Sequence, residues 1–160
     1  MEEAEKAYAC AVRALARRDH SVAELERKLR DRGIAAGTIA EVMARLEKAG
    51  FLDDRRFAER WAESAVRSGR GYGPRLHVEL ARRGVPRDII ADVVTGISAS
   101  FDEEETLAAL VARKFAGFDP QAASDRDKRR VVAYLQRRGF SIAAIFRFFR
   151  TGEDCRGGAD

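Results

Sequence analysis

The segment "GRGYGPR" (69–75) is the first candidate for chemistry in this chain, because clustered glycines can cradle a phosphate. A phosphate loop needs Lys and then Ser or Thr after its last glycine, and it follows a strand. Here Gly73 is followed by Pro74, and no strand pattern precedes the segment. Since proline suits the first turn of a helix, the residues favour a loop that ends where Pro74 opens a helix. A phosphate cradle is the less favoured alternative.

Two further groups carry side chains of the acid–base type. The segment "RDHS" (18–21) holds Asp, His and Ser, but a catalytic triad needs side chains that converge from separate segments. Asp53 and Asp54 are adjacent carboxylates, a pattern more typical of a helix N-terminus than of paired catalytic acids. With two histidines and no metal-ligand spacing, we expect no catalytic residue, no metal and no cofactor.

The basic residues are concentrated in two segments. Residues 67–87 hold six arginines and one acid, Glu79, and residues 126–150 hold eight Lys or Arg and one acid, Asp127. Such segments fit a phosphate backbone or an acidic protein surface, and the alternative is a solvated helix face. The candidate contact residues are Arg67, Arg70, Tyr72, Arg75, Arg82, Arg87, Lys128, Arg129, Arg130, Arg137 and Arg147. The aromatic segment "FSIAAIFRFF" (140–149) could stack bases, but its spacing favours the core face of a helix.

Composition narrows the class of protein. Of the 160 residues 46% are hydrophobic, enough for a core, while 35% are charged, which requires a large surface. Cys10 and Cys155 lie far apart, so neither a disulfide framework nor a metal cluster is indicated. The acidic start "MEEAEKAY" differs from a signal peptide, and no apolar run approaches the ~20 residues of a membrane helix. We expect a cytoplasmic protein without membrane contact.

An internal repeat organises the helical pattern. The segments "LERKLRDRGI", "LHVELARRGV" and "VAYLQRRGF" align, with a leucine four residues before a glycine and an arginine directly before it. The period is 51 residues and then 55. The repeat predicts an all-α fold of three tandem three-helix repeats that form an elongated, curved array. The predicted divisions are 1–52, 53–100 and 101–150, followed by a flexible tail, 151–160.

Local signals predict where these helices begin and end. "SVAE" (21–24) and "TIAE" (38–41) fit the capping box, and "SDRD" (124–127) fits it less closely. Pro74 and Pro86 suit first turns of helices. The three repeat glycines, Gly33, Gly84 and Gly139, suit the position after a helix C-terminus.

Taken together, these motifs resemble the RecX family of bacterial regulators of the RecA recombinase. The resemblance covers about residues 8–150 and rests on the segments "RDHSVAELERKL" (18–29), "GFLDDRRFAERW" (50–61), "GRGYGPRLHVEL" (69–80), "RRGV" (82–85), "ARKFAG" (112–117) and "YLQRRGF" (134–140). It implies a non-enzymatic protein that binds the groove of the RecA filament on DNA and depresses ATP turnover, strand exchange and filament extension. The implied partner is RecA, with direct contact to single- or double-stranded DNA also open, and we expect a monomer.

Two other functions stay open. The segment 24–50 holds two helices joined by a glycine turn, as in helix-turn-helix proteins, so a stand-alone DNA-binding protein is the alternative hypothesis. An enzyme that uses Asp53 or His20 is the third.

Overall fold

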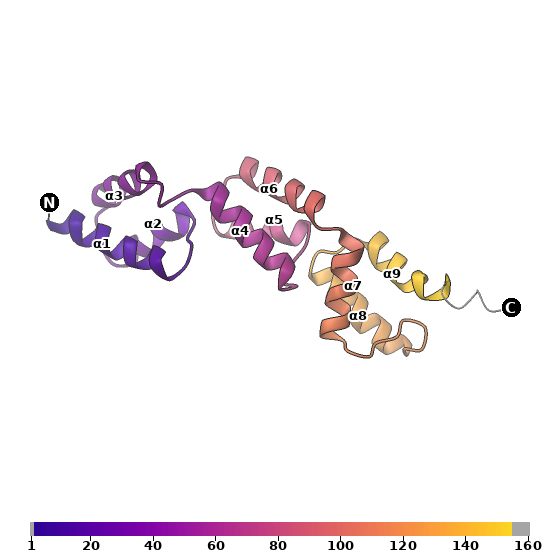
Figure 1. Cartoon of the computed structure of the whole chain (residues 1–160). Coiled ribbons are helices and arrows are strands. Elements are labelled where there is room, and N and C mark those ends of the chain that lie inside the picture. The colour runs from indigo at the N-terminus through magenta and orange to yellow at the C-terminus, as the bar shows by residue number, and fades with distance from the viewer. Residues whose placement is uncertain (1, 155–160) are drawn as a thin grey trace. The chain divides into compact units, whose positions relative to one another are not determined.

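The computed structural model describes residues 2–154, with residues 1 and 155–160 outside the description (Figure 1). Within that range the chain folds into nine α-helices and no strand, as the repeat predicts. The helices are α1 (Glu2–Arg17), α2 (Val22–Arg30), α3 (Ala36–Lys48), α4 (Asp54–Arg67), α5 (Pro74–Arg82), α6 (Arg87–Ser100), α7 (Glu103–Lys114), α8 (Asp125–Arg137) and α9 (Ile142–Asp154). No helix in this range is both long and apolar enough to cross a membrane.

Side chains that accept hydrogen bonds from exposed amides explain several helix starts. Ser21 accepts from the Glu24 amide at 3.1 Å and Ser124 from the Asp127 amide at 3.2 Å, which confirms both predicted caps. Asp53 accepts from the Arg56 amide, so capping is its observed role. The predicted cap at Thr38 is wrong, because α3 begins two residues earlier at Ala36 without a side-chain cap. Pro74 opens α5 as expected, whereas Pro86 precedes α6.

The repeat glycines end the middle helix of each triplet in the same way. Gly33, Gly84 and Gly139 have φ values of 78°, 75° and 94°, a left-handed conformation that favours glycine. In each case the amide after the glycine donates to the carbonyl of the repeat leucine five residues earlier, at 3.4, 3.2 and 3.2 Å. This is the Schellman arrangement, and it turns the chain into the next helix.

Helices α1, α2 and α3 pack around a common core in the first triplet. Its fully buried members include Ala11, Leu25, Leu29 and Leu46. In the third triplet α9 packs against α7 and α8, with Leu107, Val131 and Leu135 buried. Each element therefore buries one stripe of apolar residues and leaves its charged residues outside.

The compact units of the chain do not coincide with the triplets. One unit comprises residues 1–61 and 79–93, and the other comprises residues 62–78 and 94–160. Helices α4, α5 and α6 are each divided between the two units. The predicted divisions at 52/53 and 100/101 fall between helices, and α9 continues four residues into the segment predicted as a tail. The other residues of that predicted tail, 155–160, lie outside the described residues.

Candidate partner interface

The first basic segment, 67–87, supplies two separate groups of candidate contacts. Arg67, Arg70 and Arg75 belong to one compact unit, and Arg82 and Arg87 belong to the other. Arg75 is half-buried, and the other four are exposed. The segment therefore contributes two candidate surfaces, one in each unit.

Arg67 and Arg70 are exposed, and each contacts neighbouring side chains. The guanidinium carbon of Arg67 lies 5.2 Å from the centre of the Phe101 ring. Arg70 donates to the hydroxyls of Ser64 and Ser68, both at 2.9 Å. Aromatic and hydroxyl neighbours orient a guanidinium through its ring contacts and N–H donors, so these contacts fix the directions of both side chains.

Tyr72 is not a surface contact, contrary to the prediction. It is 5% exposed and stacks on Phe140 with ring centres 5.3 Å apart and an angle of 8° between the planes. Its hydroxyl donates to the Phe101 carbonyl at 2.7 Å, and burial raises the pKa of the phenol. The aromatic segment 140–149 is accordingly core at Phe140, although Phe146 is 65% exposed.

The second basic segment lies mainly on α8 and α9. Arg129, Arg130, Arg137 and Arg147 are exposed, and Lys128 is half-buried. Arg147 pairs with Glu104, and the guanidinium of Arg130 lies 5.9 Å from the centre of the Phe115 ring. Within residues 2–154, the side chains of Lys128, Arg129 and Arg137 make no hydrogen bond or ion pair. Their charges are therefore available to an anionic partner.

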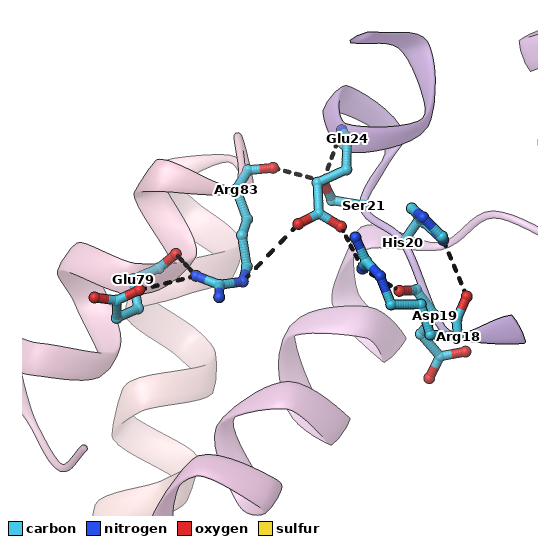
Figure 2. A network of polar contacts seen from close by, with 7 residues as sticks. All are labelled: Arg18, Asp19, His20, Ser21, Glu24, Glu79 and Arg83. Carbon is cyan, nitrogen blue, oxygen red and sulfur yellow. Dashed lines mark hydrogen bonds and ion pairs between the residues drawn. The ribbon is translucent and has the colours of Figure 1, made fainter. Parts of the chain in front are cut away.

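A joint between the first and second triplets gathers residues that lie up to 62 positions apart in the sequence (Figure 2). The Ser21 hydroxyl, which caps α2, also donates to the Arg83 carbonyl at the end of α5, at 2.5 Å. The Val22 amide donates to an Asp54 carboxylate oxygen at 2.9 Å. Gly84 lies so close to Ala23 that a Cβ on the glycine would come well under 3.0 Å from the alanine methyl carbon. The start of α2 is thus held by both α4 and the end of α5.

Charge reinforces this joint. Figure 2 shows the Arg83 guanidinium between Glu79 of α5 and Glu24 of α2, at 3.0 and 3.9 Å. The other carboxylate oxygen of Glu24 accepts from Arg18 at 2.9 Å. Arg83 also lies 4.3 Å from the centre of the Trp61 ring. Because the Glu24 and Glu79 side chains are only 11% and 17% exposed, this network is less screened than surface ion pairs.

Of the groups weighed for catalysis, Ser21 and Asp54 take part in the joint. His20 is 3% exposed, its Nδ1 lies 3.0 Å from the Arg18 carbonyl, and burial lowers its pKa. The Ser21 hydroxyl donates to the Arg83 carbonyl, so His20 and Ser21 do not hydrogen-bond each other and each engages a different backbone carbonyl. Burial raises the pKa of Asp54, an effect partly offset by the hydrogen bond from Val22. These contacts give the residues structural roles.

A second joint repeats the first between the second and third triplets. The Tyr72 amide donates to the Arg138 carbonyl at 2.8 Å, and the Arg138 guanidinium donates to the Arg70 carbonyl at 3.2 Å. A Cβ on Gly139 would lie well under 3.0 Å from the Tyr72 carbonyl oxygen. The "GRGYGPR" loop is therefore covered by the chain itself at Tyr72 and Gly73, which disfavours the phosphate cradle.

The two joints use equivalent repeat positions. Ser21 and Tyr72 both lie eight residues before the repeat leucine, while Arg83 and Arg138 both directly precede the repeat glycine. At each joint the first position donates to the carbonyl of the second. Sequence reasoning did not predict Arg83 and Arg138 as interaction sites. The signal that could have identified them is the arginine that directly precedes each repeat glycine.

Comparisons with known proteins agree with this architecture. Three family models match in order: "RecX, first three-helix domain" at residues 7–46, "RecX, second three-helix domain" at 53–94, and "RecX, third three-helix domain" at 102–149. The chain is 43% identical to "Regulatory protein RecX" of Trichlorobacter lovleyi over 89% of its length and 92% of the relative's. It is 35% identical to the protein of the same name from Syntrophotalea carbinolica, over 89% and 94%. The crystal structure of RecX from Lactobacillus salivarius has the same fold, with a TM-score of 0.75 at 21% identity over 95% of this chain and 97% of that one.

Proposed function

The chain belongs to the RecX family of regulatory proteins, and on that premise we propose that it is a negative regulator of the RecA recombinase. It binds the groove of the RecA–DNA filament and inhibits the ATPase, strand exchange and filament extension. The observation that carries this proposal is the match of all three family domains, in order, over most of the chain.

The repeat architecture supports a filament as the partner. A filament presents identical subunits at regular intervals, and this chain carries one helical unit three times. The two joints hold successive triplets by hydrogen bonds between the same repeat positions. Repeat proteins of this kind bind through surfaces that extend over several units. We propose that the divisions at 52/53 and 100/101 mark these binding units, and that the chain acts as a cytoplasmic monomer.

Exposed arginines supply the candidate contacts with the filament. Arg67 and Arg70 are oriented by Phe101 and by two serines, and Lys128, Arg129 and Arg137 extend from α8. Guanidinium groups pair with carboxylates and phosphates alike, so they suit a filament that displays both protein and DNA.

Inhibition of RecA tests the proposal. Addition of the purified chain to RecA on single-stranded DNA should lower ATP hydrolysis and slow filament extension. The double variant Arg67→Glu with Arg70→Glu should inhibit weakly at unchanged helicity. The control is Arg27→Glu with Lys48→Glu, which makes the same change of charge at exposed positions in the first triplet. No inhibition by the parent chain at stoichiometric excess would refute the proposal, and equal inhibition by both variants would remove Arg67 and Arg70 from the contact surface.

The helix-turn-helix alternative is less well supported. Helix α3 would be the recognition helix, yet the segment 36–44 at its start carries no Lys or Arg. Arg45 follows them and pairs with Glu5 at 2.7 Å while lying 3.9 Å from the centre of the Tyr8 ring. A footprint at one defined DNA sequence would favour this alternative. An activity lost in Asp53→Asn or His20→Gln, with the fold intact, would favour an enzyme.

A further inference from the structure

A cavity in the first triplet is lined by cations that neither basic segment includes. Its volume is ≈ 530 Å³, and its lining joins one face of α1 to the end of α2 and the turn that follows. The cationic lining residues are Arg13, Arg17, Lys28 and Arg32. Cys10, the buried Ala14 and Ala16 complete the wall from α1. All of these residues belong to a single compact unit.

The charge of this cavity is uncompensated. No acidic side chain is among its lining residues. In the described part of the chain, the side chains of Arg13, Arg17 and Lys28 make no hydrogen bond or ion pair, and Arg32 donates to the sulfur of Cys10. Arg13 and Arg17 are four residues apart on α1, whereas Lys28 lies in the last turn of α2 and Arg32 in the turn that follows that helix. Like charges at the spacing of Arg13 and Arg17 repel, and no acidic residue lining the cavity offsets the repulsion among the four cations.

We propose that this cavity binds the phosphates of a nucleic-acid backbone. A cluster of like charges that lowers stability is expected where an external ligand supplies the opposite charge. Backbone phosphates bring one charge per nucleotide at close spacing, and several can meet four cations at once. Guanidinium groups of Arg13, Arg17 and Arg32 offer forked donors to phosphate oxygens, and Lys28 offers a compact charge. The site does not rest on the proposed inhibition of RecA, because it is measured with protein and DNA alone.

The first test measures affinity for labelled oligothymidylate by fluorescence anisotropy over a range of salt concentrations. The variant Arg13→Ala with Arg17→Ala should bind at least about 10-fold more weakly, and its slope of log K against log salt should fall by about 1.4, or ~0.7 for each lost phosphate contact. The control Arg27→Ala with Lys48→Ala removes two exposed cations of the same triplet that do not line the cavity. Equal losses in the two variants, or no loss in the first, would overturn the proposal. Circular dichroism of both variants establishes that each is folded.

The second test uses Cys10, which is half-buried at the cavity wall, as a local reporter. In a Cys155→Ser background the rate of Cys10 alkylation is followed by mass spectrometry, with and without oligothymidylate. The oligonucleotide should slow alkylation several-fold in the parent and have little effect in Arg13→Ala with Arg17→Ala. Failure to protect would overturn the site. Equal protection by ATP at matched phosphate concentration would assign the cavity to free nucleotides instead, and equal protection by polyglutamate would assign it to acidic protein segments.

Discussion

Replacement of Gly84 by alanine tests the first joint, because the added methyl group has two distinct costs there. The first cost is conformational, since Gly84 has a φ of 75°, and a left-handed conformation costs a residue with a Cβ about 1–2 kcal/mol. The second cost is steric, because the new Cβ would lie well under 3.0 Å from the Cβ of Ala23. Overpacking of this kind costs about 1–3 kcal/mol. Gly84→Ala should therefore lower the free energy of unfolding by about 2–5 kcal/mol in total.

Two further variants separate these costs. Gly33→Ala has the same left-handed conformation, with a φ of 78°, but no atom lies within 4 Å of its added Cβ. It should lose only the conformational part, about 1–2 kcal/mol. Ala23→Gly removes the obstructing methyl carbon and leaves the Ala23 Cα at 3.9 Å, an ordinary contact. The change itself costs about 0.5–1 kcal/mol in a helix. In the double variant, Ala23→Gly should recover about 1–3 kcal/mol of the Gly84→Ala loss, which is the coupling energy of the cycle.

Urea unfolding followed by two probes measures the cycle. Far-ultraviolet circular dichroism reports all helices, and the fluorescence of Trp61, the chain's single tryptophan, reports the joint because Arg83 lies 4.3 Å from the centre of its ring. Equal destabilisation by Gly84→Ala and Gly33→Ala would refute the steric argument. Strict additivity of Gly84→Ala and Ala23→Gly would show that the two residues do not meet in solution.

Three other changes probe the second joint, the core and pH dependence. Gly139→Ala should destabilise the protein more than Gly33→Ala does, because its added Cβ would meet the backbone oxygen of Tyr72, which no side-chain substitution can remove. Equal thermal midpoints of these two variants would contradict this. Leu80→Ala, at a fully buried position, should cost about 2–5 kcal/mol in urea unfolding, and a cost under about 1 kcal/mol would place Leu80 outside the core. Because burial lowers the pKa of His20 in the folded state, the unfolded chain takes up its proton first, so stability should fall as pH drops below about 6.5. The thermal midpoint of His20→Gln should vary less between about pH 7.5 and about pH 5.5, and an unchanged pH profile would refute that origin.

The sequence was sufficient to predict helices, repeats and many helix ends because these depend on neighbours in the chain. Apolar residues at spacings of three and four define one face of each helix, and Ser21 and Gly33 act on amides and carbonyls within a few residues. The prediction of a cap at Thr38 was wrong, because α3 begins at Ala36 without a side-chain cap. The assignment to the RecX family followed from the order and spacing of such local motifs.

Only the tertiary structure decided which of the polar residues face a neighbouring triplet and which face solvent. Tyr72 was predicted as a contact residue of a basic segment, but it is buried and stacks on Phe140, 68 residues later. In the sequence, Arg83 and Arg138 look like the other arginines. Their carbonyls accept hydrogen bonds from Ser21 and Tyr72, which precede the middle helix of the triplet before. The cationic cavity likewise joins α1 to α2 across a turn. Contacts between distant segments determine the surroundings of these side chains. Helical periodicity indicates that one face of a helix is buried, but not which segment packs against it.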